Sequence, residues 1–276
     1  MSATTAVGDR DAISQHSQGF TLGRHSTYLT TRSLRTLLRQ PAYAIMTLVQ
    51  PIIWLLLFGQ LFRSVIRIPG FDVESGSYLE FITPGVIVMT ALFSSAWAGT
   101  VYIEDMNRGV MDRLLASPVR RGAMMVGTLA YQAATTLVQT VLVFGIAYAC
   151  GGRFHVVGLA ITLLAAALIS VVVASLSNAL ALLLRQQEAL IGISQFIVLP
   201  LQFVSSAIMD TRLSPAWVRH VARYNPVDWA VVASRETLSG TTQWGAVWPR
   251  LGLLGALAVA MAMLATRAFR SYQRSL

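Results

Sequence analysis

The chain has 276 residues, of which 55% are hydrophobic and only 12% are charged. Soluble domains carry roughly 25% charged residues, so this composition excludes an ordinary soluble protein and indicates a membrane bundle. The net charge of +9 comes from 21 arginines and no lysine. These arginines lie between apolar runs rather than on one face, which argues against nucleic-acid binding. The single cysteine, Cys150, excludes an intrachain disulfide, and its apolar surroundings predict burial.

The N-terminal segment is polar. Residues 1–20 lack the apolar core of a signal peptide, so we expect a disordered cytoplasmic tail there and one membrane domain over 21–276. Residues 28–39 place arginines and leucines on opposite sides of a helix that ends before Pro41. This pattern predicts a basic amphipathic helix at the membrane interface, with an ordinary polar lead-in as the alternative.

Six apolar runs have the length of membrane spans, since about 20 residues of helix cross the hydrocarbon core. They cover about 42–62, 81–101, 123–150, 157–184, 189–209 and 251–269. Lipid satisfies no backbone hydrogen bond, so these spans must be helices. The predicted fold class is an all-α membrane protein with six transmembrane helices. An even number of spans places both termini on one side, and the distribution of arginines favours the cytoplasm.

The connection between the second and third spans, EDMNRGVMDRLLASPVRRG over 104–122, is hydrophilic and has helical periodicity. Its apolar residues form one stripe: Met106, Val110, Met111, Leu114 and Leu115. Glu104, Arg108 and Asp112 follow at intervals of four, which stabilises a helix through ion pairs. Pro118 ends the pattern at Ser117. A short cytoplasmic helix over 104–117 is predicted, whose apolar stripe is covered by lipid, by the bundle or by a partner protein.

The outer connection over 210–250 contains two helix-start signals, Ser214-Pro215 and Asn225-Pro226. Tryptophan prefers the membrane–water boundary, and four of the six tryptophans occur here: Trp217, Trp229, Trp244 and Trp248. We expect two short helices that lie in the outer leaflet or dip into it. An aromatic belt without further function is the alternative.

The predicted spans contain neutral amides rather than charges at depth. Carriers driven by an ion gradient usually keep ionisable groups there, so a secondary carrier is the alternative rather than the first hypothesis. A hydrophobic or amphipathic cargo fits such a lining. Candidate lining residues in spans two and five are Phe93, Trp97, Gln195, Phe196, Gln202 and Phe203, with packing between helices as the alternative role.

Catalytic and nucleotide-binding motifs are missing from the sequence. It contains no G-x-x-x-x-G-K-[ST], and a chain without lysine lacks the lysine that binds phosphate in that loop. No H-E-x-x-H occurs, and the histidines lie outside the predicted spans. We therefore expect a transporter subunit rather than an enzyme, with its energy supplied by a partner.

Two segments resemble the type-2 ABC exporter permeases, the membrane subunits that export drugs and polysaccharides. The first contains Glu104, Gly109, Arg113-Leu114-Leu115 and Ser117-Pro118, followed by Gly127. The second is YNPVDWAVVASRETLSG over 224–240. The resemblance covers about residues 20–272 and is strongest to the daunorubicin-resistance type of permease.

This resemblance implies different functions for different segments of the chain. A coupling helix would dock on an ATP-hydrolysing subunit through Glu104, Arg108, Gly109, Arg113, Leu114, Leu115, Ser117 and Pro118. An outer gate would contain Trp217, Tyr224, Asn225, Pro226 and Trp229. Two permease chains, identical or homologous, would line the path. ATP and Mg²⁺ would bind to the partner subunit. This chain would bind no cofactor. The complex would lie in a bacterial plasma membrane.

Overall fold

The computed structural model describes residues 41–61, 78–110, 121–208, 214–238 and 243–274, and every regular element in those ranges is an α-helix. The helices are α2 (Pro41–Leu61), α3 (Tyr78–Ala96), α4 (Thr100–Asn107), α6 (Arg121–Ala149), α7 (Val156–Leu184), α8 (Gln187–Phe203), α9 (Ala216–Ala222), α10 (Pro226–Leu238) and α11 (Trp244–Arg274). The all-α class is confirmed for this part of the chain. The expected tail over 1–20 and the interfacial helix over 28–39 lie outside the described residues.

Four stretches of the described chain are long and apolar enough to cross a membrane: Tyr78–Asn107, Met124–Ala149, Val156–Leu184 and Trp244–Phe269. Each has 26 to 30 residues, which is roughly 39–45 Å of helix and more than a hydrocarbon core requires. Helix α8 has 17 residues, and the apolar part of α2 is shorter still. The chain is thus a multi-pass membrane protein, while the count of six spans stays a prediction.

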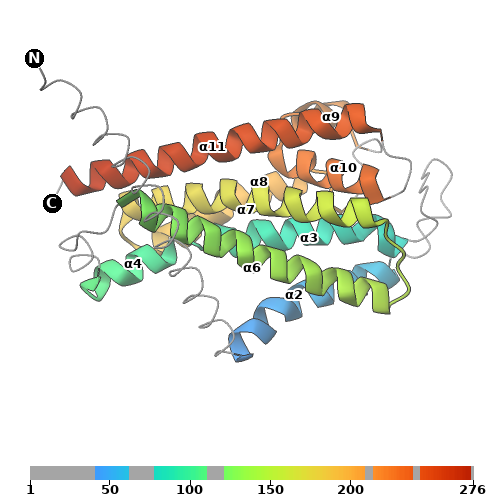
Figure 1. Cartoon of the computed structure of the whole chain (residues 1–276), viewed down its shortest axis with the longest axis horizontal. Helices are drawn as coiled ribbons and strands as arrows, with labels where there is room; N and C mark the ends of the chain where they lie inside the picture. Colours follow the sequence, from blue (N-terminus) through green and yellow to red (C-terminus); the bar gives the residue numbers. More distant parts are fainter. Residues whose placement is uncertain (1–40, 62–77, 111–120, 209–213, 239–242, 275–276) are drawn as a thin grey trace, which may run out of the picture.

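The long helices lie side by side along the long axis of the molecule, with α3, α7 and α11 running in one direction and α6 in the opposite direction (Figure 1). Helix α4 and the C-terminal end of α11 lie together at one end, on the left of Figure 1, which we call the α4 end. Helices α9 and α10 and the start of α11 lie at the opposite end, which we call the α10 end. The two segments predicted to be cytoplasmic and external therefore lie at opposite ends of the bundle.

Helix α7 is the central helix of the bundle, and it contacts α3, α4, α6, α8, α10 and α11. Its sequence explains this place, because α7 contains an 18-residue window of high mean hydropathy, 2.8, and carries no charged residue, and a helix that is largely apolar on all sides is buried. Small residues let its neighbours approach closely. The helix ends at Leu184, and the next residue, Arg185, adopts a left-handed conformation with φ of 55°.

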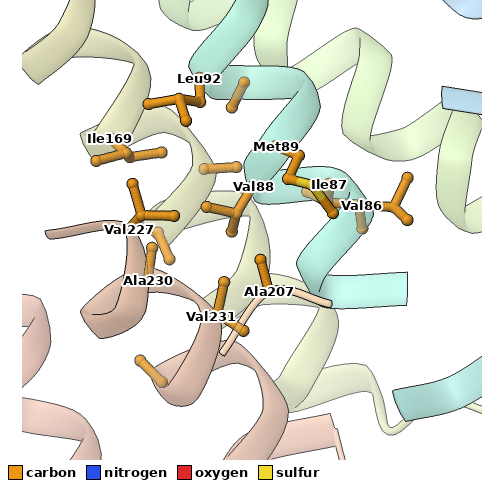
Figure 2. Packing of buried hydrophobic residues seen from close by; sticks show 14 of the residues in the cluster. Val86, Ile87, Val88, Met89, Leu92, Ile169, Ala207, Val227, Ala230 and Val231 are labelled. Carbon is orange, nitrogen blue, oxygen red and sulfur yellow. The ribbon is translucent and has the colours of Figure 1, made fainter. Parts of the chain in front are cut away.

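The apolar core has two parts. The larger cluster lies toward the α10 end, and Figure 2 shows Val88 and Leu92 of α3 packed with Ile169 of α7 and with Val227 and Val231 of α10. The smaller cluster lies toward the α4 end. It contains Tyr102, Met125, Leu182, Leu190 and Phe269 among its buried members, with Tyr102 and Phe269 meeting edge to face at 6.4 Å between ring centroids.

Polar side chains on α6 are paired in the first half of the helix. The hydroxyl of Thr128 lies 3.0 Å from the Tyr102 hydroxyl, and Gln132 Nε2 donates to Ser95 Oγ at 3.1 Å. Further along α6, Thr136 Oγ1 and Gln139 Oε1 are buried with no hydrogen-bond partner among the described residues. The directional contacts of α6 are therefore concentrated toward the α4 end.

Two predicted spans differ from the helices observed. The expected span over 81–101 is divided into α3 and α4 by a turn at residues 97–99. The expected span over 189–209 ends early, because α8 stops at Phe203 and the following residues 204–208 form a buried, non-helical segment. Cys150, which we expected to be buried, is exposed at the end of α6.

Candidate functional site

Helix α4 carries the described part of the predicted coupling segment. Tyr102 and Ile103 are buried, and Met106 packs against the smaller core cluster. The bundle itself therefore covers the side of α4 that carries these residues, which we call its base. The Arg108 guanidinium lies 3.4 Å from the Glu104 carboxylate, and these side chains are 73% and 50% exposed. A pair this exposed contributes less than about 1 kcal/mol to stability. Both charges therefore remain available to a partner surface.

The end of α4 differs from the helix predicted over 104–117. Gly109 has φ of 65°, and its N–H donates to the Met106 carbonyl at 3.1 Å. A glycine in this left-handed conformation ends a helix, so the helix is interrupted before Val110. A Cβ at Gly109 would meet no atom within 4 Å, which means that the backbone conformation, rather than space, favours glycine. The remaining predicted residues, Arg113, Leu114, Leu115, Ser117 and Pro118, lie outside the described residues.

Two short helices occur at the α10 end, where the Asn-Pro signal predicted a second helix start. Pro226 is the first residue of α10, where its missing N–H costs no hydrogen bond. Helix α10 does not lie on the surface: it packs against α3, α7, α8 and α11. It thus enters the bundle, as Figure 1 shows. Its buried residues include Val227, Asp228 and Ala230.

Asn225 connects the end of α8 to the start of α10. Its side-chain Nδ2 donates to the Leu201 and Val204 carbonyls at 2.7 and 2.6 Å, and its Oδ1 accepts from the Val227 N–H at 2.9 Å. The last carbonyls of a helix have no partner within it, and Asn225 supplies one for α8 while it caps α10. The Trp229 indole N–H donates to the Arg223 carbonyl at 2.6 Å.

The remaining residues of the predicted outer gate are exposed. Trp217 and Tyr224 expose 65% and 71% of their surface, whereas Asn225 is buried and Trp229 is half-buried. The five residues therefore differ in their burial. Asn225, Pro226 and Trp229 fix the entry of the chain into α10, and the two exposed aromatics suit the membrane–water boundary.

Sequence reasoning missed two residues of α10 that hold the segment after α8. Asp228 Oδ1 accepts from both the N–H and the hydroxyl of Ser206, at 2.8 and 2.6 Å. Arg235 Nη2 donates to the Ser206 carbonyl at 2.8 Å, and its guanidinium lies 3.7 Å from the centroid of the Phe81 ring. Ser206 is thus held through its N–H, hydroxyl and carbonyl by one helix. The signal in the sequence was an Asp and an Arg seven residues apart, on one face of α10.

The buried segment after α8 also approaches α3 closely. A Cβ at Gly85 would collide with the backbone of Ala207, so only glycine lets α3 and the segment after α8 approach each other this closely. Figure 2 shows Ala207 between α3 and Val231 of α10. Tyr78 adds a hydrogen bond from its hydroxyl to the Ile208 carbonyl at 3.4 Å. The segment is therefore fixed from α3 as well as from α10.

The predicted lining residues do not converge on one surface. On α8, Gln202 is buried and Gln195 is half-buried, each with a buried amide oxygen that has no partner among the described residues. The adjacent Phe196 and Phe203 point outward, with 80% and 70% of their surface exposed. Phe93 of α3 packs partly buried against the larger cluster, while Trp97, in the turn after α3, is 48% exposed. Helix α8 therefore turns its amides inward and its aromatic rings outward.

Comparison with known proteins identifies the family. The ABC-2 type transporter family matches residues 25–239. A daunorubicin resistance ABC transporter permease protein of Streptomyces coeruleorubidus is 29% identical over 237 residues, which cover 84% of this chain and 81% of that protein. A probable doxorubicin resistance ABC transporter permease protein of Mycobacterium tuberculosis is 24% identical over 212 residues, or 75% of each chain. The chain therefore belongs to the ABC-2 type transporter family.

Proposed function

We propose that this chain is the membrane-spanning subunit of an ATP-driven exporter that moves a hydrophobic or amphipathic compound outward across a bacterial plasma membrane. In this proposal the chain crosses the membrane six times with both termini in the cytoplasm. A separate ABC subunit binds ATP and Mg²⁺, because this chain lacks lysine and any phosphate-binding loop. A second permease chain, identical or homologous, completes the transporter.

The observation that carries the proposal is the construction of α4. Its base is anchored in the smaller core cluster, while Glu104 and Arg108 extend from the end of the bundle opposite to α10. A helix that is rigidly attached on one side and charged on the other suits contact with a cytoplasmic protein, since charges at a rim determine partner choice and association rate. The named function of the relatives as ABC permeases supports the same reading.

We place the substrate path on the outward face of α8, where a second permease chain would cover the exposed rings of Phe196 and Phe203. Apolar rings suit a hydrophobic cargo, since binding sites for such ligands are lined mainly by apolar and aromatic side chains. Two relatives are named for resistance to daunorubicin and doxorubicin, so daunorubicin is the first probe to use.

The test is purification together with a candidate ABC subunit, which is to be sought first in the reading frames next to this one. We expect the wild-type pair to purify together, and Arg108→Glu to weaken association about tenfold, which corresponds to about 1.4 kcal/mol. Arg219→Glu is the matched control, because Arg219 is an exposed arginine at the α10 end. Arg113→Glu should act like Arg108→Glu. Equal association of all variants would show that α4 is not the docking helix.

The rival hypothesis is a carrier driven by an ion gradient, and it gains one observation from the structure. Asp228 is a buried carboxylate, only 8% exposed, and buried ionisable groups are typical of proton carriers. Its Oδ1 atom already accepts two hydrogen bonds from Ser206, which argues for a structural role. Daunorubicin transport in proteoliposomes decides the matter. We expect it to require ATP and an intact ATP site on the partner, and transport driven by a proton gradient alone would support the carrier.

A further inference from the structure

The turn between α3 and α4 leaves two backbone groups without partners in their own helix. In a continuous helix, the Gly99 N–H would donate to the Ser95 carbonyl and the Ala96 carbonyl would accept from the Thr100 N–H. Here Ser95 accepts from Ala98 instead, at 3.2 Å, and the Thr100 N–H donates to Trp97 at 3.0 Å. The break thus frees one donor and one acceptor inside an apolar bundle, where unpaired backbone groups are costly.

A single hydroxyl on α7 satisfies both groups. Ser177 Oγ accepts from the Gly99 N–H at 3.0 Å and donates to the Ala96 carbonyl at 2.7 Å. Ser177 is only 2% exposed, so water does not compete for these bonds. A hydroxyl has one hydrogen to donate and lone pairs to accept with, and Ser177 uses both functions on the same break.

The turn at residues 97–99 and helix α7 are also in direct contact at this point. A Cβ at Gly99 would collide with the carbonyl of Ser177 and lie against the Ala181 side chain, so the break lies directly on the backbone of α7. One turn later, the Tyr102 hydroxyl lies 3.0 Å from Thr128 Oγ1 on α6. The base of α4 is therefore fixed to α7 and α6, while the distal charges of α4 stay exposed.

We propose that Ser177 is a positioning residue that joins α4 to α7, so that a displacement of α4 moves α7 instead of bending the chain at residues 97–99. This inference rests on the proposed function, in which the ABC subunit displaces α4. At its other end, α7 touches α10 as closely: a Cβ at Gly158 would collide with the backbone of Thr237. Through Ser177, the docking helix α4 is thus connected to the α10 end by one continuous helix, α7.

The chain offers a matched control for the hydroxyl. Ser175 lies two residues earlier on α7, is fully buried, and has an Oγ with no hydrogen-bond partner among the described residues. Ser175→Ala removes the same atom from the same helix and leaves the hydrogen bonds of Ser177 to Gly99 and Ala96 in place. Ser177→Ala frees the Gly99 N–H and the Ala96 carbonyl, which allows α4 to change its angle to α7.

The first measurement uses the chain alone, in a Cys150→Ser background, with spin labels at Val101→Cys on α4 and Leu183→Cys on α7, two exposed positions. Pulsed electron paramagnetic resonance reports the distance distribution between the labels. We expect one narrow distribution for the reference protein and for Ser175→Ala, and a broader or displaced one for Ser177→Ala. Identical distributions for the two alanine variants would overturn the proposal.

The second measurement uses the complex with the ABC subunit and labels at Tyr148→Cys and Gln243→Cys, both exposed at the α10 end. ATP should change this distance in the reference complex. In Ser177→Ala, ATP hydrolysis should continue while the fraction of complexes that show the changed distance falls about three- to tenfold, since the loss of one or two hydrogen bonds changes an equilibrium by about this factor. An unchanged response to ATP in this variant would refute the proposal that Ser177 joins α4 to α7.

Two further comparisons keep the outcomes distinct. If Ser177→Ala does not fold, the isosteric pair Ser177→Thr and Ser177→Val replaces it: the threonine variant, which keeps the hydroxyl, should behave like the reference and the valine variant should not. Equal behaviour of that pair would contradict the proposal. Failure of the wild-type chain to bind the ABC subunit counts against the proposed function, whereas the distances measured in the chain alone still decide whether Ser177 joins the helices.

Discussion

The hydrogen bonds between Asp228 and Ser206 predict a graded response to substitution. Both bonds end on the same oxygen, Asp228 Oδ1, at 2.8 Å from the Ser206 nitrogen and 2.6 Å from its hydroxyl. Asp228→Asn keeps an oxygen at this position and removes the negative charge. Asp228→Ala removes the acceptor and leaves two buried donors unpaired. The two variants therefore separate the contribution of the charge from that of the acceptor.

The magnitude follows from the number and type of these bonds. Hydrogen bonds to charged groups contribute about 1.5–3 kcal/mol each and neutral ones about 0.5–1.5 kcal/mol. Allowing for relaxation around the cavity, we expect Asp228→Ala to lower the free energy of unfolding by about 2–5 kcal/mol. Asp228→Asn should lower it by about 1–2 kcal/mol. With about 2–4 °C for each kcal/mol in a protein of this size, the unfolding midpoint falls by roughly 4–20 °C for alanine and by roughly 2–8 °C for asparagine.

The assay is thermal unfolding of the purified chain in detergent, followed by tryptophan fluorescence at one fixed scan rate because unfolding of such proteins is often irreversible. Glu188→Ala is the control, since Glu188 is an exposed acidic residue at the start of α8. Equal losses for Asp228→Asn and Asp228→Ala would show that Oδ1 does not hold Ser206. A loss for Asp228→Ala no larger than that for Glu188→Ala would refute the reasoning altogether.

Two other predictions use the same purified protein or intact cells. In a Cys150→Ser background, an impermeant thiol reagent should label Gln243→Cys in intact cells and leave Asn107→Cys unlabelled, and equal labelling of both would contradict opposite membrane faces for the two ends. Gly85→Ala should destabilise by about 1–3 kcal/mol because its Cβ collides with a neighbouring backbone. Gly145→Ala on α6, where a Cβ meets nothing within 4 Å, should be neutral or stabilise by up to about 1 kcal/mol, and similar melting of both glycine variants would rule out the close approach.

Elements that depend on local composition were predictable from the sequence. The run expected over 157–184 corresponds to α7, Val156–Leu184, and the run over 123–150 corresponds to α6, Arg121–Ala149. Continuous apolar stretches longer than 25 residues have few alternatives to a membrane helix. The start of α10 at Pro226 was also predictable, because a proline after asparagine is a local signal.

Elements that depend on distant partners were not predictable. The break at residues 97–99 contains no proline, and its hydrogen bonds are completed by Ser177, which lies 78 residues from Gly99 along the chain. The early end of α8 depends in the same way on Asn225 and Asp228, which belong to a segment that we interpreted as external. An apolar run shows that a segment prefers lipid or a core. It does not show which side chain from elsewhere will satisfy a break in its backbone.

The uneven pairing along α6 has a consequence for dynamics. Toward the α4 end, this helix is held by directional bonds at Thr128 and Gln132. Beyond them, with Thr136 and Gln139 keeping unpaired oxygens among the described residues, its buried contacts are mainly apolar, including Val143 and Phe144. Apolar contacts resist separation but not small sliding movements, since dispersion has no preferred direction. The next directional contact between α6 and the rest of the bundle, in the part of the chain that the structure describes, lies just past its end, where the Arg153 N–H donates to the Glu80 carboxylate at 2.8 Å. Small sliding movements of α6 should therefore be largest between these two attachments, around residues 136–144.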